Sequence, residues 1–178
     1  MELGLRNDEV KLTEHNPDWA KLFALEKAKI MEMTGLAAER IGHIGSTAIP
    51  GILAKPLIDI VVGVDDLSEV DDSMYEQLQE IGFYRLKVER PGEIILAKFT
   101  DGTFQVKTHF IHLTTYEGTI WENFILFRNY LIRNESARQA YESIKRDFVD
   151  GSNSGITAYT NEKEDFVKNT LEKARAEQ

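Results

Sequence analysis

The sequence Gly45-Ser46-Thr47 is the first pattern in this chain that suggests chemistry. It follows an apolar run that ends at Ile44. Gly45 allows the backbone to turn sharply, and the two hydroxyls lie next to backbone N–H groups. Proteins hold phosphates in such turns, so Gly45, Ser46 and Thr47 are candidate phosphate ligands. The alternative is an ordinary turn between two strands, because Gly-Ser pairs are common in loops.

Asp59 is the single charged residue in the apolar run from Leu57 to Val64. An ionised carboxylate in such a strand is costly unless a cation, a metal ion or several hydrogen bonds compensate it. Asp59 is therefore a candidate metal ligand and catalytic group, with a structural ion pair or a turn cap as the alternative. Lys55 precedes it and would neutralise a phosphate, unless it is a surface lysine beside Pro56.

Three histidines are further candidates for a metal ligand or a general base. His109 and His112 lie three positions apart in one predicted strand, so they face opposite sides unless a bulge or a strand end intervenes. His43 lies two residues before Gly45. The alternative for each is a packed, hydrogen-bonded histidine. Arg128, on a predicted helix with an apolar face, either reaches the pocket or pairs structurally, and the structural role is favoured.

The segments 43–51 and 54–60, His-Ile-Gly-Ser-Thr-Ala-Ile-Pro-Gly and Ala-Lys-Pro-Leu-Ile-Asp-Ile, resemble the signature of the GrpB family. The resemblance covers nearly the whole chain. It continues through Trp121, Phe127–Leu131, Ala140–Lys145, Tyr159 and Lys163.

This resemblance implies a nucleotidyltransferase-like fold, in which a Gly-Ser loop holds nucleotide phosphates and strand carboxylates hold metal ions. Gly45 and Ser46 match the loop, and Asp59 matches the first carboxylate. Active nucleotidyltransferases usually carry a second carboxylate two positions later, where this chain has Val61, which weighs against a two-metal mechanism.

Three functions therefore remain open. The first is metal-dependent nucleotidyl or phosphoryl transfer to an unknown acceptor, with Asp59, His109 and His112 as catalytic and metal-binding groups and Mg²⁺ or Mn²⁺ as cofactor. The second is a non-catalytic nucleotide- or anion-binding module with a degenerate site. The third is a metal-dependent hydrolase with His and Asp ligands, for which Zn²⁺ becomes relevant.

The predicted elements form a mixed α/β (α+β) domain over residues 1–178, with a mixed sheet of about five strands and C-terminal helices. Asn16 and Pro17 begin the first helix, and Gly35 ends it. Strands are predicted over 40–44, 57–64, 83–88, 93–100 and 103–113, with Asp101-Gly102 as a hairpin turn. Helices are predicted from Ser68 to about Gly82, from Thr119 onward, over 137–149 and over 162–174, with a flexible loop at 151–155.

The composition limits the partners. A net charge of −9 opposes binding to bulk nucleic acid, whereas a small nucleotide or phosphorylated ligand stays compatible with a local pocket. The chain has no cysteine, which excludes disulfides and thiolate metal sites. No apolar stretch suggests a leader or a membrane span. These features predict a cytoplasmic protein without a membrane partner.

Overall fold

The computed structural model describes residues 3–6, 9, 11–100, 102–149, 151 and 156–177, with the side chains of residue 89 and residues 156–161 outside the description. The strands are β1 (Leu5–Arg6), β2 (Ile41–Ile44), β3 (Ile58–Val64), β4 (Phe83–Arg90), β5 (Glu93–Phe99) and β6 (Val106–Thr115). The helices are α1 (Asp18–Thr34), α2 (Asp72–Glu80), α3 (Thr119–Arg133), α4 (Glu135–Val149) and α5 (Ile156–Ala176).

The strands form one mixed sheet in the order β2-β3-β6-β5-β4, and the short β1 pairs with β6. β3 and β6 run parallel at its centre, while the other neighbouring strands are antiparallel. The central β3 is almost entirely buried, as its apolar run predicted. This confirms the mixed sheet of five main strands and the mixed α/β class.

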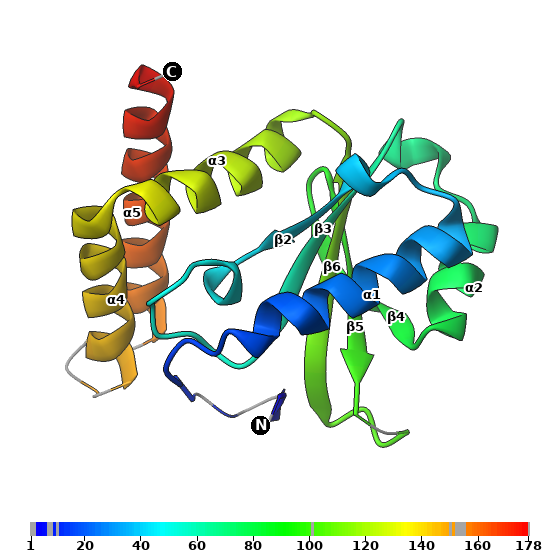
Figure 1. Cartoon of the computed structure of the whole chain (residues 1–178), viewed down its shortest axis with the longest axis horizontal. Coiled ribbons are helices and arrows are strands. Elements are labelled where there is room, and N and C mark those ends of the chain that lie inside the picture. The colour runs from blue at the N-terminus through cyan, green and yellow to red at the C-terminus, as the bar shows by residue number, and fades with distance from the viewer. Residues whose placement is uncertain are drawn as a thin grey trace.

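Helix α1 begins and ends where the sequence predicts. Asn16 Oδ1 accepts a hydrogen bond from the backbone N–H of Asp18 at 2.9 Å, and Gly35 ends the helix with φ 70°. The helix buries Trp19 and Ile30 against one face of the sheet, where α2 adds Leu78. In Figure 1 both helices lie on the same side of the central strands.

The C-terminal helices cover the other face and one edge of the sheet (Figure 1). Trp121 of α3 packs against Ile44 and Val61, on the side of β3 away from α1. Helices α3, α4 and α5 also share a second apolar cluster with the segment after β2, in which Tyr141 stacks on Phe166 with ring centroids 5.3 Å apart. This arrangement places a helical wall opposite the Gly45 turn.

Three predicted element starts are wrong by three residues or more. The helix predicted over 162–174 begins earlier, at Ile156. The helix predicted from Ser68 begins at Asp72, because Asp66 caps a short 3-10 turn at Ser68 and Asp71 caps α2 itself. The last strand begins at Val106 and not at Thr103, since residues 102–105 belong to the turn that follows β5. Asp101 of the predicted hairpin and residues 152–155 of the predicted loop lie outside the described residues.

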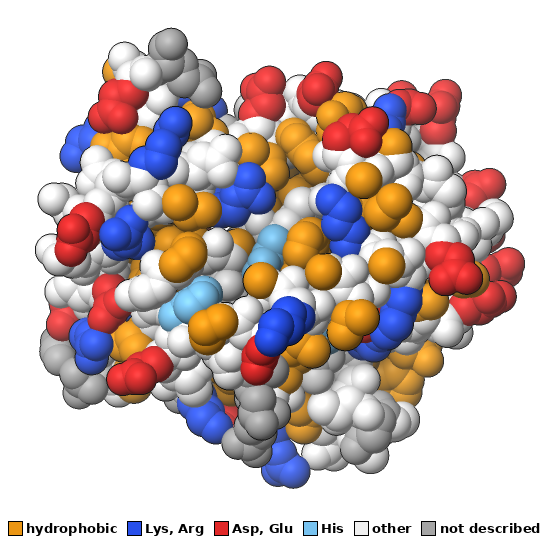
Figure 2. Space-filling view, in the orientation of Figure 1, with side chains coloured by type: hydrophobic (Ala, Val, Ile, Leu, Met, Phe, Trp, Pro, Cys, Tyr) orange, Lys and Arg blue, Asp and Glu red, His pale blue; other side chains and the backbone are white. Residues whose placement is uncertain are grey.

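The negative charge is unevenly placed on the surface. Figure 2 shows a group of acidic side chains over the α2 end of the molecule. Exposed members of this group include Asp65, Asp66, Glu69, Asp71 and Asp72. None of the helices in the described part of the chain combines the length and the apolarity needed to cross a membrane.

Candidate functional site

A cavity of about 660 Å³ lies between the sheet and the C-terminal helices. Its lining includes five of the residues singled out from the sequence, Gly45, Ser46, Lys55, Asp59 and His112. The size falls within the range of cavities that bind small molecules and cofactors. The candidate site is therefore a pocket built by both halves of the chain.

The Gly45 turn brings Ser46 to the cavity. Gly45 has φ 68° and ψ −175°, a conformation that is almost restricted to glycine. A Cβ at this position would lie 2.2 Å from Oδ2 of Asp59, so the turn presses directly against the carboxylate. The glycine thus supplies both the unusual backbone conformation and the close approach to Asp59.

Asp59 and His112 meet because β3 and β6 are parallel neighbours. Asp59 pairs with Phe110 and Val61 pairs with His112, so all four side chains share one face of the sheet. His112 Nε2 lies 3.6 Å from Asp59 Oδ1, and its Nδ1 hydrogen-bonds to Glu93 on β5. The imidazole therefore bridges two carboxylates.

The two carboxylates control the protonation of His112. Burial by itself would lower the pKa of His112, but the hydrogen bonds and charges of Asp59 and Glu93 outweigh it and raise the pKa to about 9. Burial likewise opposes ionisation of Glu93, whereas its hydrogen bond with His112 lowers the pKa of that carboxyl group. At neutral pH an imidazolium cation thus lies beside Asp59.

Lys145 of α4 reaches the same cavity from the helical wall. It is 6% exposed, its Nζ lies 3.2 Å from Ser46 Oγ, and it donates to the carbonyl of Leu53. The ammonium group also lies 4.5 Å from the ring centroid of Tyr141. No carboxylate of the described residues lies within ion-pair distance of Lys145, so this buried amine lacks a counterion.

Further cations surround the cavity. Lys55, Arg90 and Lys163 line it together with Lys145, whereas Asp59 is the one carboxylate among the described lining residues. Arg90 is also 3.6 Å from Glu93 Oε2. A local excess of positive charge therefore exists in a chain whose net charge is −9.

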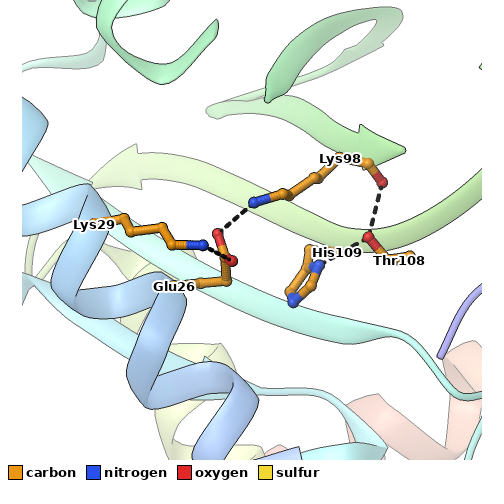
Figure 3. A network of polar contacts seen from close by, with 5 residues as sticks. All are labelled: Glu26, Lys29, Lys98, Thr108 and His109. Atoms are coloured by element: carbon orange, nitrogen blue, oxygen red, sulfur yellow. Dashed lines mark hydrogen bonds and ion pairs between the residues drawn. The ribbon is translucent and has the colours of Figure 1, made fainter. Parts of the chain in front are cut away.

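His109 does not join Asp59 and His112. It pairs with Ile58 in the sheet and faces α1, where its Nδ1 lies 2.9 Å from Thr108 Oγ1 (Figure 3). Near it, buried Glu26 forms ion pairs with Lys29 and Lys98, each at 2.8 Å (Figure 3). Burial lowers the pKa of His109 to about 4. The alternation of β6 is regular between His109 and His112, so their side chains lie on opposite faces of the sheet, as their spacing predicts where no bulge intervenes.

Three other predicted residues contribute to the framework and do not line the cavity. The Thr47 hydroxyl is buried, donating to the Leu57 carbonyl at 3.1 Å and lying 3.0 Å from His43 Nε2. His43 stacks on Phe23 of α1, and burial lowers its pKa to about 4. Arg128 Nη1 donates to the His43 carbonyl at 2.7 Å. These contacts fit the structural alternatives given for Thr47, His43 and Arg128, and for Arg128 the structural role was the favoured one.

Sequence comparison decides the family. The GrpB protein family model matches residues 9–173. The chain belongs to the GrpB family. The glutamate-rich protein GrpB of Alkalihalophilus pseudofirmus is 41% identical over 170 residues, which cover 95% of this chain and 98% of that protein.

Solved structures support the same assignment of this GrpB chain. The conserved protein GrpB from Enterococcus faecalis is 27% identical and superimposes with a TM-score of 0.75, covering 92% of this chain and 96% of that one. The Cid1 poly(U) polymerase, solved with Mg 3′-dATP bound, is 16% identical with a TM-score of 0.50, covering 75% of this chain and 42% of that one. The second likeness establishes a nucleotidyltransferase-like fold and nothing about activity.

The GrpB site does not suit a pair of metal ions. Val61, in the position of a second carboxylate, is 0% exposed and packs against Trp121. Among the described residues no three His, Cys, Asp or Glu side chains are arranged to hold one metal ion. Among the described residues that line the cavity, Asp59 alone offers a carboxylate. His112 would have to lose a proton before it could bind a metal. A single ion therefore fits only if a bound ligand supplies further oxygen atoms.

Glu93 and Lys145 are site residues that the sequence patterns did not predict. Glu93 begins an apolar strand. A carboxylate buried there, like that of Asp59, is costly unless a cation or hydrogen bonds compensate its charge. Lys145 follows Ile144 on the apolar side of an amphipathic helix, and a lysine at such a position signals either snorkelling or a buried role. Neither signal identifies the partner, because each partner is distant in the sequence.

Proposed function

We propose that the protein binds a nucleotide, or another phosphorylated ligand of similar size, with its phosphates between Ser46 and Lys145. The observation that carries the proposal is the buried Lys145 amine without a carboxylate partner among the described residues. Burial lowers the pKa of Lys145 to about 7, so its ammonium form is costly until an anion compensates it. A phosphate at this position supplies that anion and accepts a hydrogen bond from Ser46.

The remaining lining fits the rest of such a ligand. Lys55 and Lys163 extend the positive region, which suits more than one phosphate group. Phe110, Phe124 and Phe127 provide an apolar wall beside it, where a base or another flat group would pack. The cavity therefore combines a cationic end with an aromatic side.

A second candidate function is metal-dependent nucleotidyl or phosphoryl transfer from the bound ligand. It is favoured by Asp59, whose carboxylate is 29% exposed and lines the cavity. Asp59 and ligand phosphate oxygens would together hold Mg²⁺ or Mn²⁺, which prefer oxygen ligands. Such an ion would neutralise charge on the transferring group. The buried Val61 favours one ion over two, and a hydrolase with both His109 and His112 as ligands finds less support.

The binding proposal is tested by thermal and isothermal titration measurements with ATP and with tripolyphosphate, each with and without Mg²⁺. A ligand at a hundred times its Kd should add about 2.7 kcal/mol to the free energy of unfolding. Lys55→Met should weaken binding, whereas Lys87→Met, which changes an exposed lysine on β4 outside the cavity, should leave it unchanged. The proposal fails if neither compound stabilises the folded protein.

Asp59→Asn separates the two candidates. Loss of the Mg²⁺-dependent part of ATP binding, with binding in the presence of EDTA preserved, would support a metal held by Asp59. Equal binding by the wild type and the variant at every Mg²⁺ concentration would leave a non-catalytic binding module as the function.

A further inference from the structure

Ser46 and Lys145 form a hydroxyl–amine pair on the cavity wall. Their Oγ and Nζ atoms are 3.2 Å apart, although the residues are 99 positions apart in the chain. The Leu53 carbonyl accepts another hydrogen bond from Nζ and fixes the end of the lysine side chain. The Tyr141 ring packs beside the amine, with its centroid 4.5 Å away. The pair is thus held by the Leu53 carbonyl and packed against the buried Tyr141 ring.

The surroundings of Lys145 favour the neutral amine. Burial is the largest influence, and together with the positive charge of Lys163 on α5 it outweighs the opposing charge of Glu142 and lowers the pKa of Lys145 to about 7. Glu142, on the same helix, is engaged by Arg146 at 2.7 Å and by the backbone N–H of Leu53 at 3.2 Å. It is therefore not free to pair with Lys145.

Tyr141 is the other titratable group that faces the amine. Burial raises its pKa to about 12, an effect that its hydrogen bond with Ser46 only partly offsets. The phenol therefore stays neutral at physiological pH and adds no negative charge next to Lys145. A neutral lysine amine has a lone pair that can accept the proton of a neighbouring hydroxyl group.

The Gly45 turn gives the hydroxyl its direction. Ser46 is the first residue of a 3-10 turn that follows the strained conformation of Gly45, and it lines the cavity. The Asp59 side chain lies against Gly45 of the same turn. A serine held in a sharp turn after a strand, with a base within hydrogen-bond distance, has the geometry of an activated nucleophile.

We propose that Ser46 is a nucleophile and Lys145 its general base, and that Ser46 accepts a phosphoryl group from a phosphoric anhydride bound in the cavity. The inference rests on the proposed function, because the bound ligand must deliver the phosphorus atom. Acyl esters are less suitable substrates, since Lys55, Arg90 and Lys163 favour a polyanion in the cavity.

Phosphoryl transfer to Ser46 requires no group beyond the ligand, Ser46 and Lys145. Ser46 Oγ forms a bond to the terminal phosphorus atom, and the Ser46 proton moves to Lys145 Nζ. The bond between that phosphorus and the bridging oxygen breaks, and the shortened phosphate leaves with the electron pair. The products are a phosphoserine and an ammonium group that faces it. Water or an acceptor hydroxyl then takes the phosphoryl group and restores Ser46, while Lys145 returns its proton.

The experiment measures covalent labelling of the full chain at Ser46. One sample is treated with ATP and another with diisopropyl fluorophosphate, which loses fluoride to an activated serine, and modified peptides are identified by mass spectrometry. The expected result is modification at Ser46 with both reagents, at a rate that rises with pH. The half-maximum should lie near pH 7 for the uncharged diisopropyl fluorophosphate and at higher pH for ATP, because bound phosphates raise the pKa of Lys145. Ser46→Ala should remove the label.

Lys145→Arg separates catalysis from binding. Arginine keeps the positive charge for an anion but cannot act as a base near neutral pH, so labelling should fall about a hundredfold while ATP still stabilises the protein. Lys87→Arg is the matched control on an exposed strand and should react at the wild-type rate. Labelling of Lys145→Arg at the wild-type rate, or no label on wild-type Ser46, overturns the inference. ATP binding without any label would leave the proposed binding function intact.

Discussion

Replacing Gly45 with alanine should destabilise the protein and displace the Asp59 carboxylate. The backbone conformation of Gly45 costs other residues about 1–3 kcal/mol. The added Cβ would also lie 2.2 Å from Asp59 Oδ2 and 3.0 Å from its Cγ, an overlap that a shift can relieve at a further cost of about 1–3 kcal/mol. Gly45→Ala should therefore lower the free energy of unfolding by roughly 2–6 kcal/mol.

Gly51→Ala is the matched control. Gly51 also has a positive φ, 76°, but nothing lies within 4 Å of a Cβ at that position. Its replacement should cost only the backbone strain, about 1–2 kcal/mol. Urea-induced unfolding of both variants then shows how far the cost at Gly45 exceeds that of a positive φ in open space, within the same segment between β2 and β3.

The pKa of His112, measured in the same variants, reports the position of the Asp59 carboxylate. If the carboxylate moves away from His112, the pKa of that imidazole should fall below about 9, because Asp59 is one of the two groups that raise it. An NMR titration of the imidazole proton signals measures this directly. Equal destabilisation by the two alanines, with the pKa of His112 unchanged in Gly45→Ala, would refute the close packing of the turn on Asp59.

Three further predictions concern the charged and apolar groups around the strands. Glu93→Gln should lower the pKa of His112 in an NMR titration, because it removes one of the two charges that raise that pKa to about 9; an unchanged pKa would contradict the bridge. Val61→Asp should cost roughly 3–5 kcal/mol in urea unfolding, because the position is fully buried; a near-neutral effect would instead indicate a cation ready to receive the carboxylate. The pKa values of His43 and His109 are lowered to about 4, so their contribution to stability should be lost as pH falls from 6.5 to 4. Urea unfolding measured across that window tests this in the wild type and in His43→Gln, which should lose less stability there; equal losses would contradict the lowered pKa of His43.

Much of the element order was predictable from local patterns. The unbroken apolar run of β3 indicated a covered central strand, and Gly35 marked the end of α1. The start of α2 was misplaced because two acidic residues, Asp66 and Asp71, each have the chemistry of a helix cap. Local capping patterns do not indicate which of two successive turns continues into a helix.

The site was predictable only in part, because its geometry depends on strand order. The spacing of His109 and His112 left open whether they share a face, and the register with β3 shows that they do not. β6 does have an irregular pairing with β5, but it lies before His109, between the partners of Lys98 and Phe99. The alternation from His109 to His112 is therefore regular.

Lys145 illustrates the limit of reading one segment at a time. Its contact with Ser46 joins residues from α4 and the turn after β2, which no local periodicity connects. The packing of α3, α4 and α5 against that turn creates the contact. A lysine on the buried side of a helix indicates that its positive charge must be compensated or lost. The identity of its partner comes only from the tertiary fold.

The division of the cavity between two parts of the chain has a mechanical consequence. Asp59 and Ser46 belong to the sheet region, whereas Lys145 and Lys163 belong to helices that follow it. A ligand that contacts both groups links the helices to the sheet. Its binding therefore raises the free energy of local opening of α4 and α5. Amide hydrogen exchange in those two helices would then slow far more than exchange in β4.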